Sequence, residues 1–276
     1  MQRHPKNQHY VPQFLLKNFY SKDINHIWCY DKTFKNTEER SISKVASENY
    51  FYDTIAGQEE GSLEYLLSKA ETETAPIISK IIKTKKIEIL TIDEKEILAL
   101  FIALQLNRTK SAFKNYERFN EYFFGKIKEI YNAFNLEHDF GEKTKKEVWL
   151  SNFSDTPIFA SILINKLWFL LESDSKFYTS DNPVVLQNSI NRKEHRGTLG
   201  LNSDGIEIYF PLSDSLAIIL LCERVYGALR GKKLPLMMPE NIENMNALQV
   251  IYSERFIFSS QNNFELVKDM LSKGQT

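Results

Sequence analysis

One stretch of the chain, residues 93–109, most constrains how the chain can fold. Thr91 precedes this stretch and can cap a helix, and Glu94, three residues further on, can complete a capping box. The stretch is then apolar nearly all the way round a helix, at Ile97, Leu98, Leu100, Phe101, Ile102 and Leu104. A helix without a polar face is covered on every side in a folded protein. We therefore predict a central, buried helix.

The apolar pattern divides the rest of the chain into a helical part and a strand-rich part. From about residue 60 to 165, apolar residues recur at helical spacing, which predicts further helices at 113–134 and 156–164. From about 166 to 260, short apolar runs alternate with turn residues, a pattern typical of hairpins. The predicted hairpins pair 167–171 with 176–179, 206–210 with 216–221, and 248–252 with 255–259. Smaller predicted elements are strands at 24–30 and 50–52 and helices at 11–19 and 264–273.

This order of elements predicts an α+β fold, because helices and strands are segregated along the chain and do not alternate. We expect a helical middle region packed on an antiparallel-leaning C-terminal sheet. A chain of 276 residues can bury a large core. We therefore predict a single domain over residues 1–276.

The near balance of basic and acidic residues argues against a protein whose net charge attracts nucleic acid or anionic membranes. The chain has 35 Lys and Arg against 36 Asp and Glu, a net charge of −1. A local basic run, Lys80–Lys86, is interpreted as a solvated helix end, with direct DNA contact as the alternative. The longest apolar runs, 97–104 and 216–222, are far shorter than the ~20 residues of a membrane-spanning helix. We expect a cytoplasmic protein with no membrane partner, in which Cys29 and Cys222 are buried, reduced thiols.

Polar residues stand at unexpected places in the run from His9 to Phe19. Pro12 suits the first turn of a helix, where its missing N–H costs nothing, and Gln13 and Lys17 share one face of that helix. His9 precedes the helix and could exchange a proton or donate to an anion near neutral pH. The alternative is a histidine that braces the helix start.

A second polar pair, Gln105 and Arg108, ends the central helix. The two residues are three apart and therefore share one face. A buried arginine needs an anionic partner, which Glu64, Glu71 or Asp181 could supply. Arg108 is thus either half of a structural ion pair or a group that grips an anionic ligand.

The third polar group is Ser180-Asp181-Asn182-Pro183, which follows an aromatic strand. Asp and Asn before Pro favour an ordinary turn. Alternatively, Asp181 projects from a strand end into a cleft as an acid, a base or a metal ligand. The five histidines show no zinc spacing, and neither a phosphate-binding glycine loop nor a nucleophile elbow is present, so the sequence assigns no cofactor.

At these positions the chain resembles a bacterial and phage-associated family, domain of unknown function 4238. The resemblance rests on His-Tyr-Val-Pro-Gln and the helix to Asn18-Phe19, on Gln105 with Arg108, and on Ser-Asp-Asn-Pro at 180–183. Weaker matches follow at Phe210–Ser213 and near 244–246. The resemblance implies one full-length domain and marks a candidate polar cluster. Its members would be His9, Gln13, Gln105, Arg108, Asp181 and Asn182.

Two functions are compatible with this cluster. In the first, the protein is a hydrolase acting on a phosphate-containing or nucleic-acid substrate. Arg108 then grips an anion, His9 and Asp181 act as catalytic residues that handle protons or a metal, and Gln13, Gln105 and Asn182 orient the substrate. In the second, the cluster is a buried structural network in a non-enzymatic binding or sensor module linked to phage conflict or mobile elements.

Overall fold

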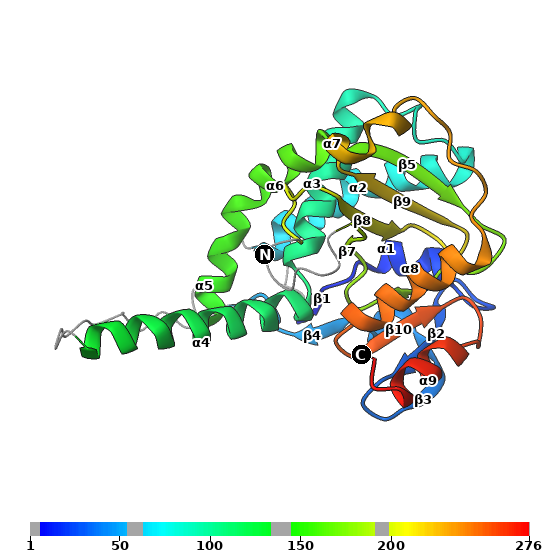
Figure 1. Cartoon of the computed structure of the whole chain (residues 1–276). Helices are drawn as coiled ribbons and strands as arrows, with labels where there is room; N and C mark the ends of the chain where they lie inside the picture. The colour runs from blue at the N-terminus through cyan, green and yellow to red at the C-terminus, as the bar shows by residue number, and fades with distance from the viewer. Residues whose placement is uncertain (1–5, 54–62, 134–144, 191–198, 276) are drawn as a thin grey trace.

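The computed structural model describes residues 6–53, 63–133, 145–190 and 199–275 and confirms a mixed α+β fold (Figure 1). The helices are α1 (Gln13–Leu16), α2 (Leu63–Thr84), α3 (Ile92–Asn107), α4 (Lys110–Ala133), α5 (Lys145–Ser151), α6 (Thr156–Ile164), α7 (Glu223–Tyr226), α8 (Pro239–Tyr252) and α9 (Glu265–Ser272). The strands are β1 (Asn7–His9), β2 (His26–Asp31), β3 (Asn36–Ser41), β4 (Ser47–Asn49), β5 (Leu167–Glu172), β6 (Thr179–Ser180), β7 (Val185–Asn188), β8 (Ile206–Pro211), β9 (Leu216–Leu221) and β10 (Phe256–Ser259).

Helix α3 is the central helix that the sequence predicts. Thr91 and Glu94 form the expected capping box, with the Glu94 N–H donating to the Thr91 hydroxyl and the Thr91 N–H donating to the Glu94 carboxylate. The helix packs between α2 and α6, and Leu98, Phe101 and Ile102 are fully buried. Its position between two helices explains why it carries apolar residues on nearly every side.

Two antiparallel four-stranded sheets make up the strand-rich part. The first has the order β5-β9-β8-β7, and every residue of its central strands β8 and β9 is buried. The second has the order β3-β2-β10-β6 and joins the N-terminal hairpin of the chain to its C-terminal strand. Helix α8 lies between the two sheets, in contact with β6 of one and β7 of the other (Figure 1). A short pair, β1-β4, holds the start of the described chain.

Several predicted elements are confirmed because their partners are close in the chain. The hairpin of β8 and β9 forms as expected, as do the helices at 156–164 and 264–273, with α9 ending at Ser272. The predicted helix over 11–19 is split into α1 and a 3-10 turn at Lys17–Phe19.

Three strand predictions are wrong. β5 pairs with β9 and not with 176–179, because β6 belongs to the other sheet. The predicted strand at 248–252 is the last part of α8, which begins with Pro239 at its first turn. Residues 50–52 form a turn after β4, with Tyr50 at a positive φ of 55°. Short apolar runs fit a strand and one side of a buried helix equally well, so their pattern alone does not separate the two.

None of the helices in the described ranges is long and apolar enough to cross a membrane. Cys29 and Cys222 are both buried and free, and burial raises the pKa of Cys29 to about 12.

The capping box gives a first test. We expect Thr91→Ala to lower the free energy of unfolding by about 1 kcal/mol, because the Glu94 N–H loses its acceptor at the exposed start of α3. Thr91→Ser keeps the hydroxyl and should leave stability nearly unchanged. Urea unfolding followed by circular dichroism measures both, and equal effects of the two substitutions would contradict this role of Thr91.

Candidate functional site

The three polar groups predicted from the sequence meet at the C-terminal end of α3. Arg108 is the C-cap residue of this helix and is buried. Its Nη2 donates to the main-chain oxygen of His9 over 2.6 Å, and its Nη1 donates to Oε1 of Glu71 over 2.7 Å. Its Nε donates to the Tyr52 hydroxyl over 3.3 Å. The guanidinium therefore joins α3 to β1, to α2 and to the turn after β4.

Glu71 is one of the partners that the sequence suggests for Arg108, and its carboxylate is about one quarter exposed. Tyr52 strengthens the junction from the other side, because its hydroxyl donates to the main-chain oxygen of Arg108 over 2.9 Å. All three nitrogens of the Arg108 guanidinium group thus have partners within the protein. An arginine with this many internal partners has few donors left for a ligand.

The glutamines of the cluster differ in their surroundings. Gln105 is fully buried, and its Nε2 donates to the main-chain oxygen of Tyr10 over 2.8 Å, which ties α3 to the segment before α1. Its Oε1 has no hydrogen-bond partner in the described part of the chain. Gln13 is the first residue of α1 and is only half-buried.

His9 reaches the cluster mainly through its backbone. Burial lowers the pKa of its imidazole, against the hydrogen-bonding effect of the Ile42 and Ser43 backbone. Its Nε2 is buried and has no partner among the described residues. His9 therefore favours the neutral form.

Asp181 is turned toward the backbone that leads into β10. Its Oδ1 accepts the N–H of Glu254 over 2.8 Å, and its Oδ2 accepts the N–H groups of Arg255 and Phe256 over 2.7 and 2.9 Å. Complete burial raises the pKa of Asp181 to about 6, and the three amides oppose this shift. The carboxylate thus fixes the turn between α8 and β10.

Asn182 links the same region to the helices. Its Oδ1 accepts the Thr109 hydroxyl over 3.0 Å, and its Nδ2 donates to the main-chain oxygen of Tyr252 over 3.1 Å. We call the six predicted residues the signature cluster; the bonds above tie His9, Gln105, Arg108, Asp181 and Asn182 into neighbouring segments, whereas Gln13 makes no side-chain hydrogen bond among the described residues. Most of their polar atoms already bind protein atoms, and this saturation favours a structural network over an open site.

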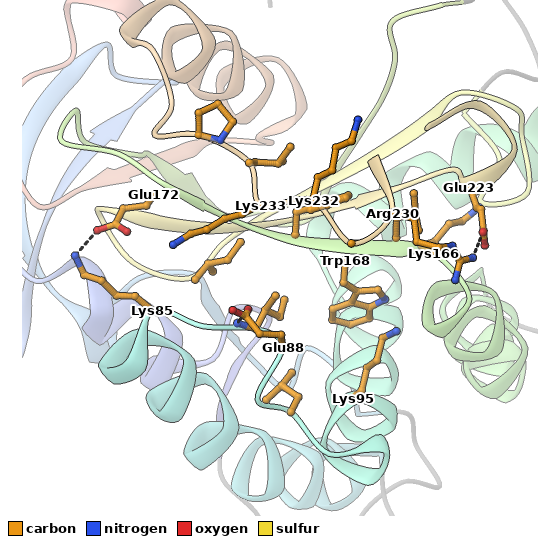
Figure 2. A pocket seen from close by; sticks show the side chains of 18 of the residues that line it. Lys85, Glu88, Lys95, Lys166, Trp168, Glu172, Glu223, Arg230, Lys232 and Lys233 are labelled. Atoms are coloured by element: carbon orange, nitrogen blue, oxygen red, sulfur yellow. Dashed lines mark hydrogen bonds and ion pairs between the residues drawn. The ribbon is translucent and has the colours of Figure 1, made fainter. Parts of the chain in front are cut away.

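A different region has the shape of a ligand site. A cleft of about 870 Å³ opens beside strand β5, on the side away from β9 (Figure 2). Its walls are the connection between α2 and α3, the edge strand β5 and the segment 230–236. This basic cleft is lined by six cationic side chains: Lys85, Lys95, Lys166, Arg230, Lys232 and Lys233.

The lining carries far more positive charge than the chain as a whole. Three acidic residues, Glu88, Glu172 and Glu223, accompany the six basic ones, which gives a net charge of +3 in a chain whose net charge is −1. Two of the cations are neutralised, since Lys85 pairs with Glu172 and Arg230 pairs with Glu223 (Figure 2). The other four have no ion-pair partner in the part of the chain that the structure describes: Lys95, Lys166, Lys232 and Lys233.

Trp168 provides an aromatic surface within the cleft. Its indole Nε1 donates to the main-chain oxygen of Leu163 over 3.0 Å, which fixes the ring. The ammonium of Lys95 lies 5.3 Å from the ring centre, within the range of a cation–π contact (Figure 2). Burial lowers the pKa of both Lys95 and Lys166 from their ordinary value. An anionic ligand would compensate this unfavourable burial of charge.

The edge of β5 offers further donors. The main-chain oxygen of Glu172 accepts the Met237 N–H over 3.0 Å, whereas the Ser173 N–H donates toward the β9 side, to Ser215. Backbone groups alternate in direction along a strand, so those of Trp168 and Leu170 point outward like those of Glu172. Within the described ranges they have no hydrogen-bond partner, and they are available to a ligand in the cleft.

The sequence did not reveal the basic cleft. The run Lys80–Lys86 was interpreted as a solvated helix end, and within it Lys80 does pair with Glu94 while Lys85 lines the cleft. The available signals were a tryptophan in an edge strand and the Lys232-Lys233 pair after Gly231. Neither indicates a site until the fold brings them together.

No group of three or more His, Cys, Asp or Glu in the described ranges could hold a metal ion. Three of the five histidines, His4, His138 and His195, lie outside those ranges.

Comparison with known proteins identifies the family of this chain. The sequence model of a protein family, described as protein of unknown function (DUF4238), matches residues 7–263 of this chain. The chain belongs to this family. Neither the curated proteins nor the solved structures contain a match. The signature cluster and the basic cleft both lie within the matched range.

Arg108 offers a direct test of the structural network. We expect Arg108→Lys to lower the free energy of unfolding by about 3 kcal/mol, because a lysine cannot hold Glu71, His9 and Tyr52 together and leaves buried groups unpaired. Thermal unfolding followed by calorimetry measures the loss. Lys80→Gln, which breaks a more exposed ion pair with Glu94, should cost less than about 1 kcal/mol. A stable Arg108→Lys variant would show that the network does not support the fold.

Asp181 gives a second test of the same kind. Asp181→Asn places an amide N–H₂ among three backbone donors, so at least one buried N–H loses its acceptor. We expect a loss of about 2 kcal/mol in the free energy of unfolding. The matched change Asp174→Asn is on an exposed residue and should have no measurable effect. Equal stability of the two variants in urea unfolding would refute the capping role of Asp181.

Proposed function

We propose that this protein is a binding module for a phosphate-bearing small molecule, held in the basic cleft. The observation that carries the proposal is the set of four lysines in the cleft lining that have no ion-pair partner among the described residues, one of which, Lys95, lies over the Trp168 ring. Ammonium groups bind phosphate oxygens as strong, charge-assisted donors. Trp168 and Leu170 also line the cleft, and their outward N–H groups add neutral donors.

The aromatic ring suggests what the rest of the ligand is. An indole that is held in place beside cations can stack on a planar base while the cations hold the phosphates. A nucleotide combines both groups. The volume of about 870 Å³ falls within the range of small-molecule sites.

A nucleic-acid partner fits the charge distribution less well. The cations gather in one cleft and not in a continuous track along the surface, and the chain has a net charge of −1. Within Lys80–Lys86, both Lys80 and Lys85 are engaged in ion pairs with glutamates. A binding module of this kind also fits the alternative hypothesis from the sequence, a non-enzymatic binding or sensor module.

Binding can be measured with ATP, pyrophosphate and adenosine by isothermal titration calorimetry. We expect ATP to bind best, pyrophosphate less well and adenosine least, since phosphate contacts dominate. Lys95→Gln and Lys166→Gln should each weaken ATP binding at least about 10-fold, the effect of losing one charged hydrogen bond. Affinity should also fall as salt concentration rises.

Two controls sharpen this experiment. Lys44→Gln removes an exposed charge far from the cleft and should leave the affinity for ATP unchanged. Trp168→Phe should weaken ATP binding more than pyrophosphate binding, because it shrinks the stacking surface and removes the indole N–H bond to Leu163 that fixes the ring. Absence of binding by both ATP and pyrophosphate, or equal binding by all the lysine variants, would contradict the proposal.

The hydrolase hypothesis is a second candidate at the signature cluster. Two observations favour it: His9 has a buried Nε2 without a partner in the described residues, and the pKa of Asp181 is about 6. A phosphatase assay on ATP and pyrophosphate tests it, with His9→Ala as the variant. Hydrolysis that disappears in a folded His9→Ala protein would support an enzyme, and equal rates would remove His9 from the chemistry.

A further inference from the structure

Helix α4 carries an apolar surface that the rest of the described chain leaves open. The helix projects away from the body of the molecule (Figure 1). Phe119, Tyr122, Phe123 and Ile130 are 60%, 61%, 47% and 56% exposed. Soluble monomers rarely expose large aromatic side chains together in this way, so such a patch marks an interaction surface.

Phe119, Phe123 and Ile130 lie on one face of the helix, whereas Phe124, which is 42% exposed, lies on another. Phe119 and Phe123 are four residues apart and stack with a ring separation of 5.8 Å. Ile130 follows Phe119 by eleven residues, which is close to three full turns and returns to the same face. We call Phe119, Phe123, Ile127 and Ile130 the α4 stripe; Tyr116, at its inner end, is partly buried and packs on the core of the same chain.

A different face of α4 contacts the body. Phe113 packs on Trp149 with a ring separation of 5.0 Å, and Lys114 pairs with Glu254. Lys110 pairs with Glu48 on the same side. At about 100° per residue, Lys110, Lys114 and Glu117 lie roughly opposite to Phe119. Within the described part of the chain, Phe119, Phe123 and Ile130 are therefore open to a separate molecule.

The stripe is complementary to itself in one arrangement. If two α4 helices cross antiparallel with Phe123 on the two-fold axis, Phe119 faces Ile127 of the second copy, and Ile130 comes near the part of Tyr116 that its packing on the core leaves exposed. In a two-fold antiparallel pair, residues on one edge of the first helix face residues on the same edge of the second helix. Arg118 and Glu129 lie on the same edge of α4. Arg118 has no ion-pair partner in the described residues, and Glu129 is exposed and pairs only with Lys126, over 2.7 Å. The antiparallel register places each Arg118 near Glu129 of the other copy, twice by symmetry.

We propose that this protein associates as a two-fold symmetric dimer through the α4 stripe. The occupant of the surface is thus a second copy of the chain. The exposed parts of the aromatic side chains and Ile130 give several hundred Å² on each copy, below the ~800 Å² per partner of a standard stable interface. The dimer should therefore be weak and reversible, with a dissociation constant in the micromolar range.

Sedimentation equilibrium over a micromolar concentration series tests this dimer on the full chain. We expect the weight-average mass to rise from monomer toward dimer with concentration. Phe123→Glu and Ile130→Glu should raise the dissociation constant at least 10-fold. The matched control is Ile158→Glu, on α6, whose isoleucine is 58% exposed and should leave association unchanged.

A charge exchange tests the antiparallel register itself. Arg118→Glu and Glu129→Arg should each weaken the dimer, because like charges then face one another. The double variant should restore association, which neither misfolding nor binding to a different partner would produce. A monomer at every concentration, or a dimer that Phe123→Glu leaves intact, would overturn the proposal. The nucleotide-binding test of the cleft is independent of either result.

Discussion

The buried guanidinium of Arg108 is the interaction on which the rest of this structure depends. A charge taken out of water is costly unless its donors are satisfied, and here the partners come from three directions. Glu71 lies on α2, Tyr52 follows β4, and the main-chain oxygen of His9 belongs to β1. The central helix can therefore end only where these three segments meet, which fixes the N-terminal part of the chain against the helical part.

Helix α3 separates this structural junction from the basic cleft. Lys95, in its first turns, lines the cleft, whereas Arg108 caps its other end. Thirteen residues of helix place them about 20 Å apart. The two regions also differ in character, because Arg108, Asp181 and Asn182 are bonded to protein atoms, while the cleft holds lysines that have no ion-pair partner in the described residues. Arg108 and its partners thus build the frame, and the open cleft lies at the opposite end of the same helix.

The sequence predicted those parts of the fold that depend on local interactions. The capping box at Thr91 and Glu94 and the hairpin of β8 and β9 involve residues that are close in the chain, so their patterns suffice. β5 was assigned the wrong partner because its true partner, β9, lies more than forty residues further on. The end of α8 was mistaken for a strand because Leu248–Tyr252 is short and apolar, and only its packing between two sheets shows that it is helical.

The candidate sites, like the fold, were predictable in some parts and not in others. Arg108 and Asp181 were conspicuous as polar residues among apolar ones, and Glu71 was anticipated as a partner of the arginine. The backbone amides that surround Asp181 were not predictable, because a sequence does not show where a main chain turns back. The cleft was invisible for a related reason: its lysines are ordinary surface residues in three distant segments, and only the fold makes them a group.

The position of Asn182 connects the signature cluster with helix α4. The Thr109 hydroxyl donates to Asn182 and also accepts the N–H of Ala112 over 3.1 Å, in the first turn of α4. Asn182 in turn is held by Tyr252, at the end of α8. The direction in which α4 leaves the body is therefore set at the junction where Arg108 ends α3. If α4 is where two copies meet, the same buried polar residues that close the fold also fix how the two copies are oriented.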